Sequence, residues 1–360
     1  MAVNTDFKGM LEDLYSSYGY EKYRMAGFEE YSLYLENKNF LTSDKMITFN
    51  DLDGRLMALK PDVTLSIVKN ALPGTGVGKY YYTESVYRPN KASDAFRELT
   101  QTGLEALGAV DEVTVTEAVE LALKSLELAG AEYVLALSDV RFTEGLIHAI
   151  GKGEEVKEQL REIIAKKSVG EIKPLAEKYD LTDRDVEALQ AIITLPAEPE
   201  KALSVADKFA FGKGANAAID ELKALINAFS GTRYADKLQI DFSITGNTGY
   251  YNGVLFSGYI LGVADAVLKG GRYDKLADIA GAGKGAIGFA LYTDEIIEKY
   301  FSGENYPDMV IEYGDDCDTA ALLRAADNCR AMGKKVLLSA GGAGSHGKKY
   351  LFKDGELIEE

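Results

Sequence analysis

Hydrophobic residues recur at helical spacing near the start of the chain. Phe7, Leu11, Leu14 and Tyr18 are separated by three or four positions, Met10 lies three after Phe7 and four before Leu14, and Gly19 follows them. Side chains at these intervals share one face of an α-helix, and a glycine often ends one. The pattern therefore predicts an amphipathic N-terminal helix that packs on a core through this face.

The pattern changes to short strands and turns from about residue 46 to residue 108. Asp53 and Gly54 are typical of a tight hairpin turn between two apolar runs. Further strands are expected between residues 79 and 108, and a long helix at about 112–129.

Residues 141–232 return almost wholly to helical periodicity. Thr182 followed by Asp185 resembles a capping box, in which each residue caps the other's backbone at a helix start. Two apolar stripes are evident: Val156, Leu160, Ile163 and Ile164, and then Ile219, Leu222, Leu225, Ile226 and Phe229. We interpret this stretch as a helical insertion.

Strand character resumes from Leu238 to Leu268, and a glycine-rich passage leads into a helix at residues 293–301. A small unit follows, with the order strand, helix, strand and a hairpin that turns at Asp354 and Gly355. We predict an α+β fold, an antiparallel sheet flanked by helices. The expected divisions are a core (1–300) with its insertion at about 141–232, a linker (301–307) and a C-terminal α/β unit (308–360).

Composition and charge narrow the possible functions. The chain has 360 residues, is 46% hydrophobic and has a net charge of −17, which disfavours a surface that binds nucleic-acid phosphates. It contains no run of 18 or more apolar residues and no leader pattern at its start, so we expect neither membrane insertion nor export. Cys317 and Cys329 have no histidine at metal-ligand spacing, and we expect free thiols, no metal and a cytoplasmic protein.

Two glycine motifs resemble nucleotide-binding loops. Gly342 to Lys348 fits the phosphate-binding pattern, but Lys349 replaces the magnesium-binding hydroxyl and a hairpin follows where a helix is required. Gly283, Gly285 and Gly288 fit the dinucleotide fingerprint without a surrounding βαβ unit. We therefore expect no nucleotide cofactor, and we attribute the second motif to close backbone packing.

One strand presents an unusual polar face. Arg97, Leu99, Gln101, Gly103 and Glu105 are spaced two apart and thus lie on one side of a strand, where Gly103 leaves room between two polar groups. This face either holds a small polar ligand or is simply solvated, and spacing alone does not decide between the two.

Five motifs then occur in an order that resembles histidyl-tRNA synthetase. They are KPDVT (60–64), YRPNKASDAFRELTQTGLEALG (87–108), YYNGVLF (250–256), GGRYD (270–274) and GAIGFAL (285–291). The resemblance covers roughly residues 5–300, and the C-terminal unit looks like a shortened anticodon-binding domain.

The resemblance implies that ATP and an amino acid lie side by side on an antiparallel sheet. Carried over by position, the residues that hold histidine in this family are Asp62, Thr64, Gln101, Glu105, Tyr251 and Tyr273. Carboxylates attract an ammonium group, and Glu105 and Tyr273 suit the imidazole nitrogens.

The chain departs from the family pattern where ATP chemistry requires cations. By alignment, Ser85 replaces the phosphate-binding arginine of the second motif, Gly246 replaces the second catalytic arginine, and Glu295 replaces the arginine of the last motif. Ala26 also replaces a family proline. Since each lost donor typically costs roughly 100- to 1,000-fold in rate, we expect no synthetase activity and assign no catalytic residue.

This combination resembles the regulatory subunits of ATP phosphoribosyltransferase in histidine biosynthesis. The resemblance implies a non-catalytic subunit that pairs with the short-form catalytic subunit, a homodimer formed through the N-terminal region, feedback by free histidine, and no tRNA partner. Two alternatives stay open, a divergent adenylating enzyme and an amino-acid sensor with another partner.

Overall fold

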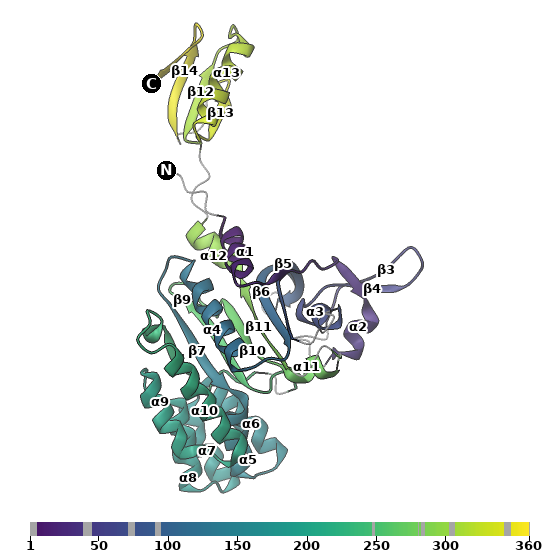
Figure 1. Cartoon of the computed structure of the whole chain (residues 1–360), viewed down its shortest axis with the longest axis vertical. Helices are drawn as coiled ribbons and strands as arrows, with labels where there is room; N and C mark the ends of the chain where they lie inside the picture. Colours follow the sequence, from purple (N-terminus) through teal and green to yellow (C-terminus); the bar gives the residue numbers. More distant parts are fainter. Residues whose placement is uncertain are drawn as a thin grey trace. The chain divides into compact units, whose positions relative to one another are not determined.

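The computed structural model describes residues 6–38, 45–70, 76–90, 95–246, 249–279, 281, 285–301, 307–341 and 347–359. The chain divides into two compact units, residues 1–301 and 302–360. An eight-stranded sheet organises the first unit and a four-stranded sheet the second (Figure 1).

The large sheet has the strand order β1-β5-β6-β11-β10-β9-β7-β8. Its strands are β1 (Glu21–Lys22), β5 (Val77–Asn90), β6 (Ala95–Gly108), β7 (Tyr133–Asp139), β8 (Leu238–Ile240), β9 (Val254–Ile260), β10 (Leu268–Arg272) and β11 (Gly285–Tyr292). All the inner pairs are antiparallel, which confirms the predicted sheet, while short parallel strands β1 and β8 close its two edges.

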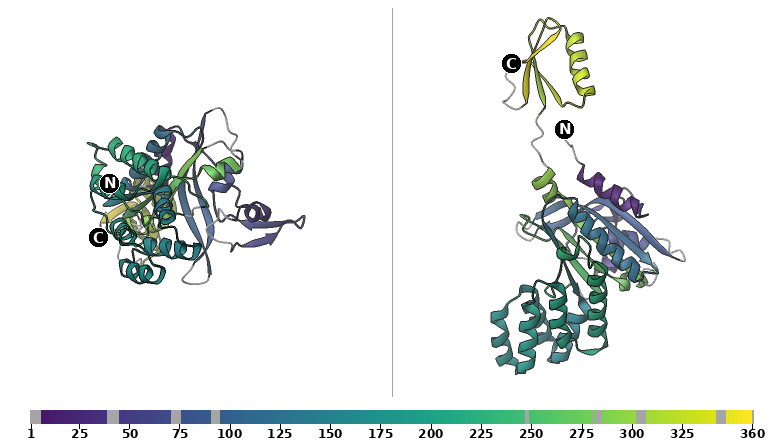
Figure 2. Two further views of the ribbon diagram at one scale, coloured as in Figure 1. Left: turned by 90° about the horizontal axis from the view of Figure 1, so that it is seen from below. Right: turned by 60° about the vertical axis from the view of Figure 1, so that its left-hand side comes forward.

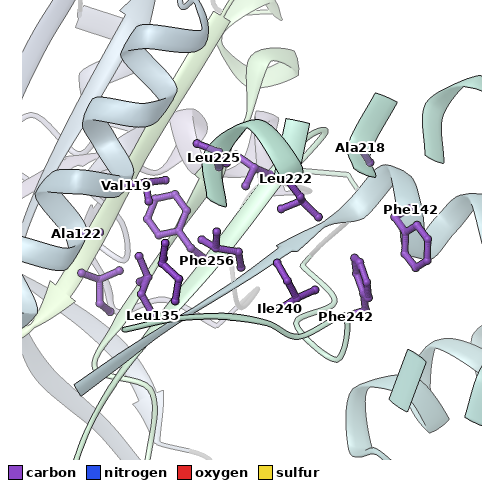
Figure 3. Packing of buried hydrophobic residues seen from close by; sticks show 14 of the residues in the cluster. Val119, Ala122, Leu135, Phe142, Ala218, Leu222, Leu225, Ile240, Phe242 and Phe256 are labelled. Atoms are coloured by element: carbon purple, nitrogen blue, oxygen red, sulfur yellow. The ribbon is translucent and has the colours of Figure 1, made fainter. Parts of the chain in front are cut away.

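One face of the sheet is covered by α1 (Phe7–Ser17) and α4 (Glu112–Glu127). The predicted N-terminal stripe is confirmed, since Phe7 and Leu11 are buried and Met10, Leu14 and Tyr18 pack against the same core. Figure 3 shows how side chains of α4, such as Val119 and Ala122, meet Phe256 and Leu135 of the sheet. This face is a continuous apolar core.

The opposite face carries smaller elements. They are α2 (Tyr31–Glu36), α3 (Thr64–Asn70), α11 (Asp274–Ile279) and a three-stranded sheet of β2 (Phe28–Glu30), β4 (Leu56–Leu59) and β3 (Thr48–Asn50). The predicted hairpin at Asp53 and Gly54 connects β3 and β4, and Gly54 has a φ of 79°, which glycine adopts readily. These elements bury a second apolar cluster around Tyr34, Tyr82 and Tyr273.

Helices fill the predicted insertion. They are α5 (Val140–Ile150), α6 (Glu154–Lys166), α7 (Val169–Tyr179), α8 (Asp183–Ile193), α9 (Pro199–Ala206), the short 3-10 helix Asp207–Phe209 and α10 (Gly212–Ala228). They gather at one end of the sheet, beside β7 and β8 (Figure 2). Thr182 and Asp185 form the predicted capping box at the start of α8.

The first unit ends with α12 (Thr293–Ile296) and a π-helical turn (Ile297–Phe301). The second unit contains β12 (Met309–Tyr313), α13 (Thr319–Ala331), β13 (Val336–Ser339), β14 (Lys348–Lys353) and β15 (Glu356–Glu359). Its sheet has the order β13-β12-β14-β15, and Asp354 and Gly355 form the predicted hairpin turn. The interpretation of this unit as a shortened anticodon-binding domain stays a prediction.

The structure also bears on the nucleotide-loop motifs and on the cysteines. Residues 342–346 and Gly283 lie outside the described residues, but the chain enters strand β14 after Gly347 and strand β11 at Gly285. Neither motif therefore opens a helix. Cys317 and Cys329 are free thiols. None of the helices that the structure describes is long and apolar enough to cross a membrane.

Close backbone packing explains several glycines of the sheet. A Cβ at Gly103 would lie 2.2 Å from the carbonyl oxygen of Phe289 and 2.7 Å from the hydroxyl of Tyr82. At Gly288 it would lie 1.9 Å from a carboxylate oxygen of Glu105. The sheet surface at these positions has no room for a side chain, as predicted for the motif that contains Gly288.

We expect Gly103→Ala to lower the free energy of unfolding by about 1–3 kcal/mol, because the backbone of β11 must move to admit the methyl group. The matched control is Gly170→Ala in α7, where a Cβ meets nothing within 4 Å. The control should leave stability unchanged or raise it by about 0.4–1 kcal/mol. Chemical denaturation of both variants measures the difference, and equal stabilities would contradict the packing argument.

Candidate functional site

A cavity of about 240 Å³ opens on the sheet face that carries α3 and α11. This volume is below the 300–1,000 Å³ of pockets for drug-sized ligands, so it suits a ligand of amino-acid size. Its walls are Asp62, Thr64, Tyr82, Arg88, Gln101, Glu105, Tyr250, Tyr251, Lys269, Tyr273, Gly288, Phe289, Ala290 and Tyr292. The cavity is therefore rich in polar and aromatic side chains.

The alternation of side chains along β6 and β11 determines which residues lie at the bottom of this cavity. Gln101, Gly103 and Glu105 share one face of β6, as predicted from their spacing. Their cross-strand partners on β11 are Tyr292, Ala290 and Gly288, respectively, and residues directly opposite in a sheet lie on the same face. Ala290 and Gly288 form a low floor of the cavity, whereas the hydroxyl of Tyr82 lies against Gly103.

A buried hydrogen-bond network closes the inner end of the cavity. Thr64 donates from Oγ1 to one carboxylate oxygen of Glu105 at 2.6 Å, and the hydroxyl of Tyr273 donates to the other. Thr64 begins α3, and Tyr273 precedes α11. One carboxylate of the sheet thus connects both small helices to it.

The Glu105 carboxyl group has an unusual acidity. Burial raises its pKa from 4.5 to about 8, although the hydrogen bonds from Thr64 and Tyr273 lower it in part. The negative charge of Asp62 raises the pKa further. Glu105 is therefore mostly protonated at neutral pH when the cavity holds no cation.

An ion pair forms another wall. Arg88 donates to the carboxylate of Asp62 at 3.3 Å, to the carbonyl of Pro61 at 2.8 Å and to the hydroxyl of Tyr292 at 3.1 Å. Asp62 also accepts a hydrogen bond from the backbone N–H of Leu65 in the first turn of α3. Arg88 is consequently fixed in position, and its charge is balanced by Asp62.

One amide side chain of the cavity is left without a hydrogen bond among the described residues. Residue Gln101 as a whole is only 2% exposed, and its side-chain amide forms no hydrogen bond with any residue that the structure describes. Since buried amides are normally hydrogen-bonded, this group is suited to a ligand. The rings of Tyr250 and Tyr273, which also line the cavity, stack with their centroids 5.2 Å apart. The ring of Tyr251 meets that of Tyr250 edge-on, with the centroids 4.6 Å apart.

The structure brings all six sequence-predicted residues into this one cavity. They are Asp62, Thr64, Gln101, Glu105, Tyr251 and Tyr273. Thr64 and Tyr273 are already hydrogen-bonded to Glu105. The side chain of Gln101 has no hydrogen-bond partner among the described residues. Their role in binding histidine stays a prediction.

Sequence reasoning missed five lining residues of chemical interest: Tyr82, Arg88, Tyr250, Lys269 and Tyr292. Arg88 and Tyr250 lie inside two of the five motifs, so their closeness in sequence to the predicted site residues could have identified them. Lys269 and Tyr292 reach the cavity through the pairing of β10, β11 and β6. Nothing local in the sequence reveals that pairing.

The three positions assigned to lost arginines all lie outside the cavity lining. Ser85 pairs with Thr100, so strand alternation places it on the sheet face opposite Gln101. Glu295 is exposed in the first turn of α12, and Ala26 is exposed between β1 and β2. A Cβ at Gly246 would lie 2.7 Å from the ring of Tyr251, so an arginine there requires this tyrosine to move.

The register of β5 shows which residues of the second motif face the cavity. Glu84, rather than Ser85, shares the cavity face of the sheet, because it pairs with Gln101. Lys60, which is 4% exposed, forms a buried ion pair with Glu84. The cavity side of this segment therefore presents a carboxylate with its own cation, which is an unfavourable environment for phosphate groups.

This arrangement can bind a small molecule that carries one positive and one negative group. Asp62 and Glu105 offer carboxyl oxygens to an ammonium or imidazole group, while Arg88 and Lys269 offer positive charge to a carboxylate. The described residues contain no cluster of three or more His, Cys, Asp and Glu side chains suited to a metal ion.

Comparisons with known proteins agree with this geometry. A family model described as histidyl-tRNA synthetase matches residues 2–296. Among curated proteins, an ATP phosphoribosyltransferase regulatory subunit from Clostridium acetobutylicum is 26% identical, over 98% of this chain and 89% of the relative. A protein of the same name from Oceanobacillus iheyensis is 23% identical, over 91% of this chain and 82% of its own.

Solved structures share the fold. One from Bacillus halodurans, described as an ATP phosphoribosyltransferase regulatory subunit/histidyl-tRNA synthetase, has a TM-score of 0.76 at 22% identity and covers 95% of this chain and 90% of its own. A chain of the ATP phosphoribosyl transferase (HisG:HisZ) complex from Thermotoga maritima has a TM-score of 0.65 at 16% identity, with 82% and 98% covered. The resemblance predicted from the sequence is confirmed, and the chain belongs to the histidyl-tRNA synthetase family.

Proposed function

We propose that this chain is a non-catalytic regulatory subunit of ATP phosphoribosyltransferase, which acts in the first step of histidine biosynthesis in the cytoplasm. The observation that carries the proposal is the asymmetry of the site. The six residues expected around an amino acid converge on one cavity, whereas Arg88, the arginine of its described lining, is already paired with Asp62.

The remaining cations near the cavity support the absence of synthetase chemistry. Adenylate formation needs positive charge on the ATP phosphates as negative charge develops. Arg88 is paired with Asp62, and Lys60 is paired with Glu84. A phosphate group would have to compete with these carboxylates, and Lys269 is the one cation of the cavity lining without such a partner among the described residues.

The names of the relatives support a catalytic phosphoribosyltransferase subunit as the partner. The curated relatives are called regulatory subunits, and one structural neighbour is part of a HisG:HisZ complex. We therefore propose that the short-form catalytic subunit binds this chain, which activates it or transmits histidine feedback. The net charge of −17 supports the absence of a tRNA partner.

A homodimer through the N-terminal region also belongs to this proposal. Phe28 and Phe49 lie edge-to-face at 5.2 Å on the small three-stranded sheet and are 46% and 37% exposed. Leu52 and Leu56, on the same hairpin, are exposed as well. Contiguous exposed apolar groups of this kind are typical of interaction sites, and we assign this one to a second copy of the chain.

Adding the chain to a short-form catalytic subunit should raise the rate of phosphoribosyl transfer at least several-fold, because the catalytic form depends on its regulatory partner in this proposal. Size-exclusion chromatography should show one complex that contains both proteins. The control is an equal amount of a histidyl-tRNA synthetase, which has the same fold. Separate elution with an unchanged rate would count against the proposed partner.

Histidine binding should release a proton at pH 7. Glu105, with a pKa of about 8 in the empty cavity, is mostly protonated there, and the α-ammonium group of histidine, which is already cationic at pH 7, would lower that pKa from within the same cavity. Calorimetry in two buffers of different ionisation enthalpy measures the released protons.

The matched variants are Glu105→Gln, which keeps the shape but cannot ionise, and Glu144→Gln in the insertion, which removes a carboxylate paired with Arg161. The first should bind histidine at least 10-fold more weakly and release no proton from this site. The second should behave like the natural chain. Equal affinity and equal proton release in Glu105→Gln would show that the carboxyl group has only a structural role.

A further inference from the structure

Lys269 is the one charged side chain of the cavity wall that has no ion-pair or hydrogen-bond partner among the described residues. The other charged groups of the cavity wall already have partners. Asp62 and Arg88 pair with each other, and Glu105 accepts hydrogen bonds from Thr64 and Tyr273. Lys269, which is exposed, is therefore the cation of this wall that is available to a ligand.

The register of the sheet shows how Lys269 reaches the ligand. Lys269 of β10 lies opposite Ala290 of β11, which in turn lies opposite Gly103 of β6. Because cross-strand partners share a face, the lysine stands on the cavity side at the end of a row of two small residues. Strands are about 4.8 Å apart, so its flexible four-carbon stem can extend across the neighbouring Ala290 into the cavity.

We propose that Lys269 binds the α-carboxylate of the amino acid in this cavity, so that the site selects free amino acids and rejects analogues without a carboxylate. The inference rests on the proposed histidine site and adds the group that recognises the acid end of the ligand. The ammonium and side chain of the ligand then face the carboxyl groups of Asp62 and Glu105.

The charge balance favours a carboxylate over a phosphate or a neutral group. The Asp62–Arg88 pair is neutral, so one carboxylate matches the single unpaired cation. A nucleotide brings several negative charges into a cavity of about 240 Å³, and Glu84 stands on the same face of the sheet. A neutral alcohol at this position would leave the lysine without a counter-charge and gain only a weaker hydrogen bond.

Calorimetric titration of L-histidine and of L-histidinol, in which an alcohol replaces the carboxylate, tests the proposal on the full chain. The natural protein should bind histidine about 10-fold more tightly than histidinol, as expected for one charge-assisted hydrogen bond. Lys269→Met should lose this preference by weakening histidine alone. Lys269→Arg, which keeps the charge, should retain most of it.

The control is Lys208→Met, which removes an exposed charge on the insertion that has no ion pair with any described residue, and it should match the natural protein. Equal affinities of the natural protein for both ligands would overturn the role of Lys269 and leave the histidine site standing. The same conclusion would follow if Lys269→Met weakened both ligands equally or neither. Binding of neither ligand to the natural protein would overturn the histidine site and this inference together.

Discussion

The carboxyl group of Glu105 is the constraint around which the site is organised. It is 2% exposed and has no cation bonded to it. A buried carboxyl group is costly unless it is neutral or hydrogen-bonded, and here the raised pKa keeps it mostly protonated while Thr64 and Tyr273 donate to it. The sheet leaves room for it only because Gly288 has no side chain. The starts of α3 and α11 are positioned by the same group.

This constraint connects the amino-acid half of the proposed site to the stability of the fold. Thr64, Glu105 and Tyr273 stabilise the fold as well as the cavity, so replacing any of them would leave a buried polar group without its partner. The ATP side has no such coupling. Ser85 is on the other sheet face, and Glu295 is exposed, so their side chains are free of the cavity network. Changes at Ser85 or Glu295 therefore leave the hydrogen bonds of Glu105 intact.

Local patterns were sufficient for much of the fold and for part of the site. The spacing of Gln101 and Glu105 predicted their common face, because alternation in a strand is a local property. The assignment of Ser85 to the arginine position stays a prediction, since alignment by motif does not fix which face of β5 a residue takes. Lys269 and Tyr292 were missed, because they meet β6 only through the pairing of strands that are distant in sequence.

The central claim is that the chain binds an amino acid in this cavity but cannot activate it with ATP. The most direct test is histidine-dependent exchange of labelled pyrophosphate into ATP, measured on chain that has been saturated with histidine. We expect no exchange above that of a sample without protein, because the cavity offers no unpaired arginine for the phosphates among the described residues. Exchange at a rate typical of a histidyl-tRNA synthetase would show that the chain activates the amino acid after all.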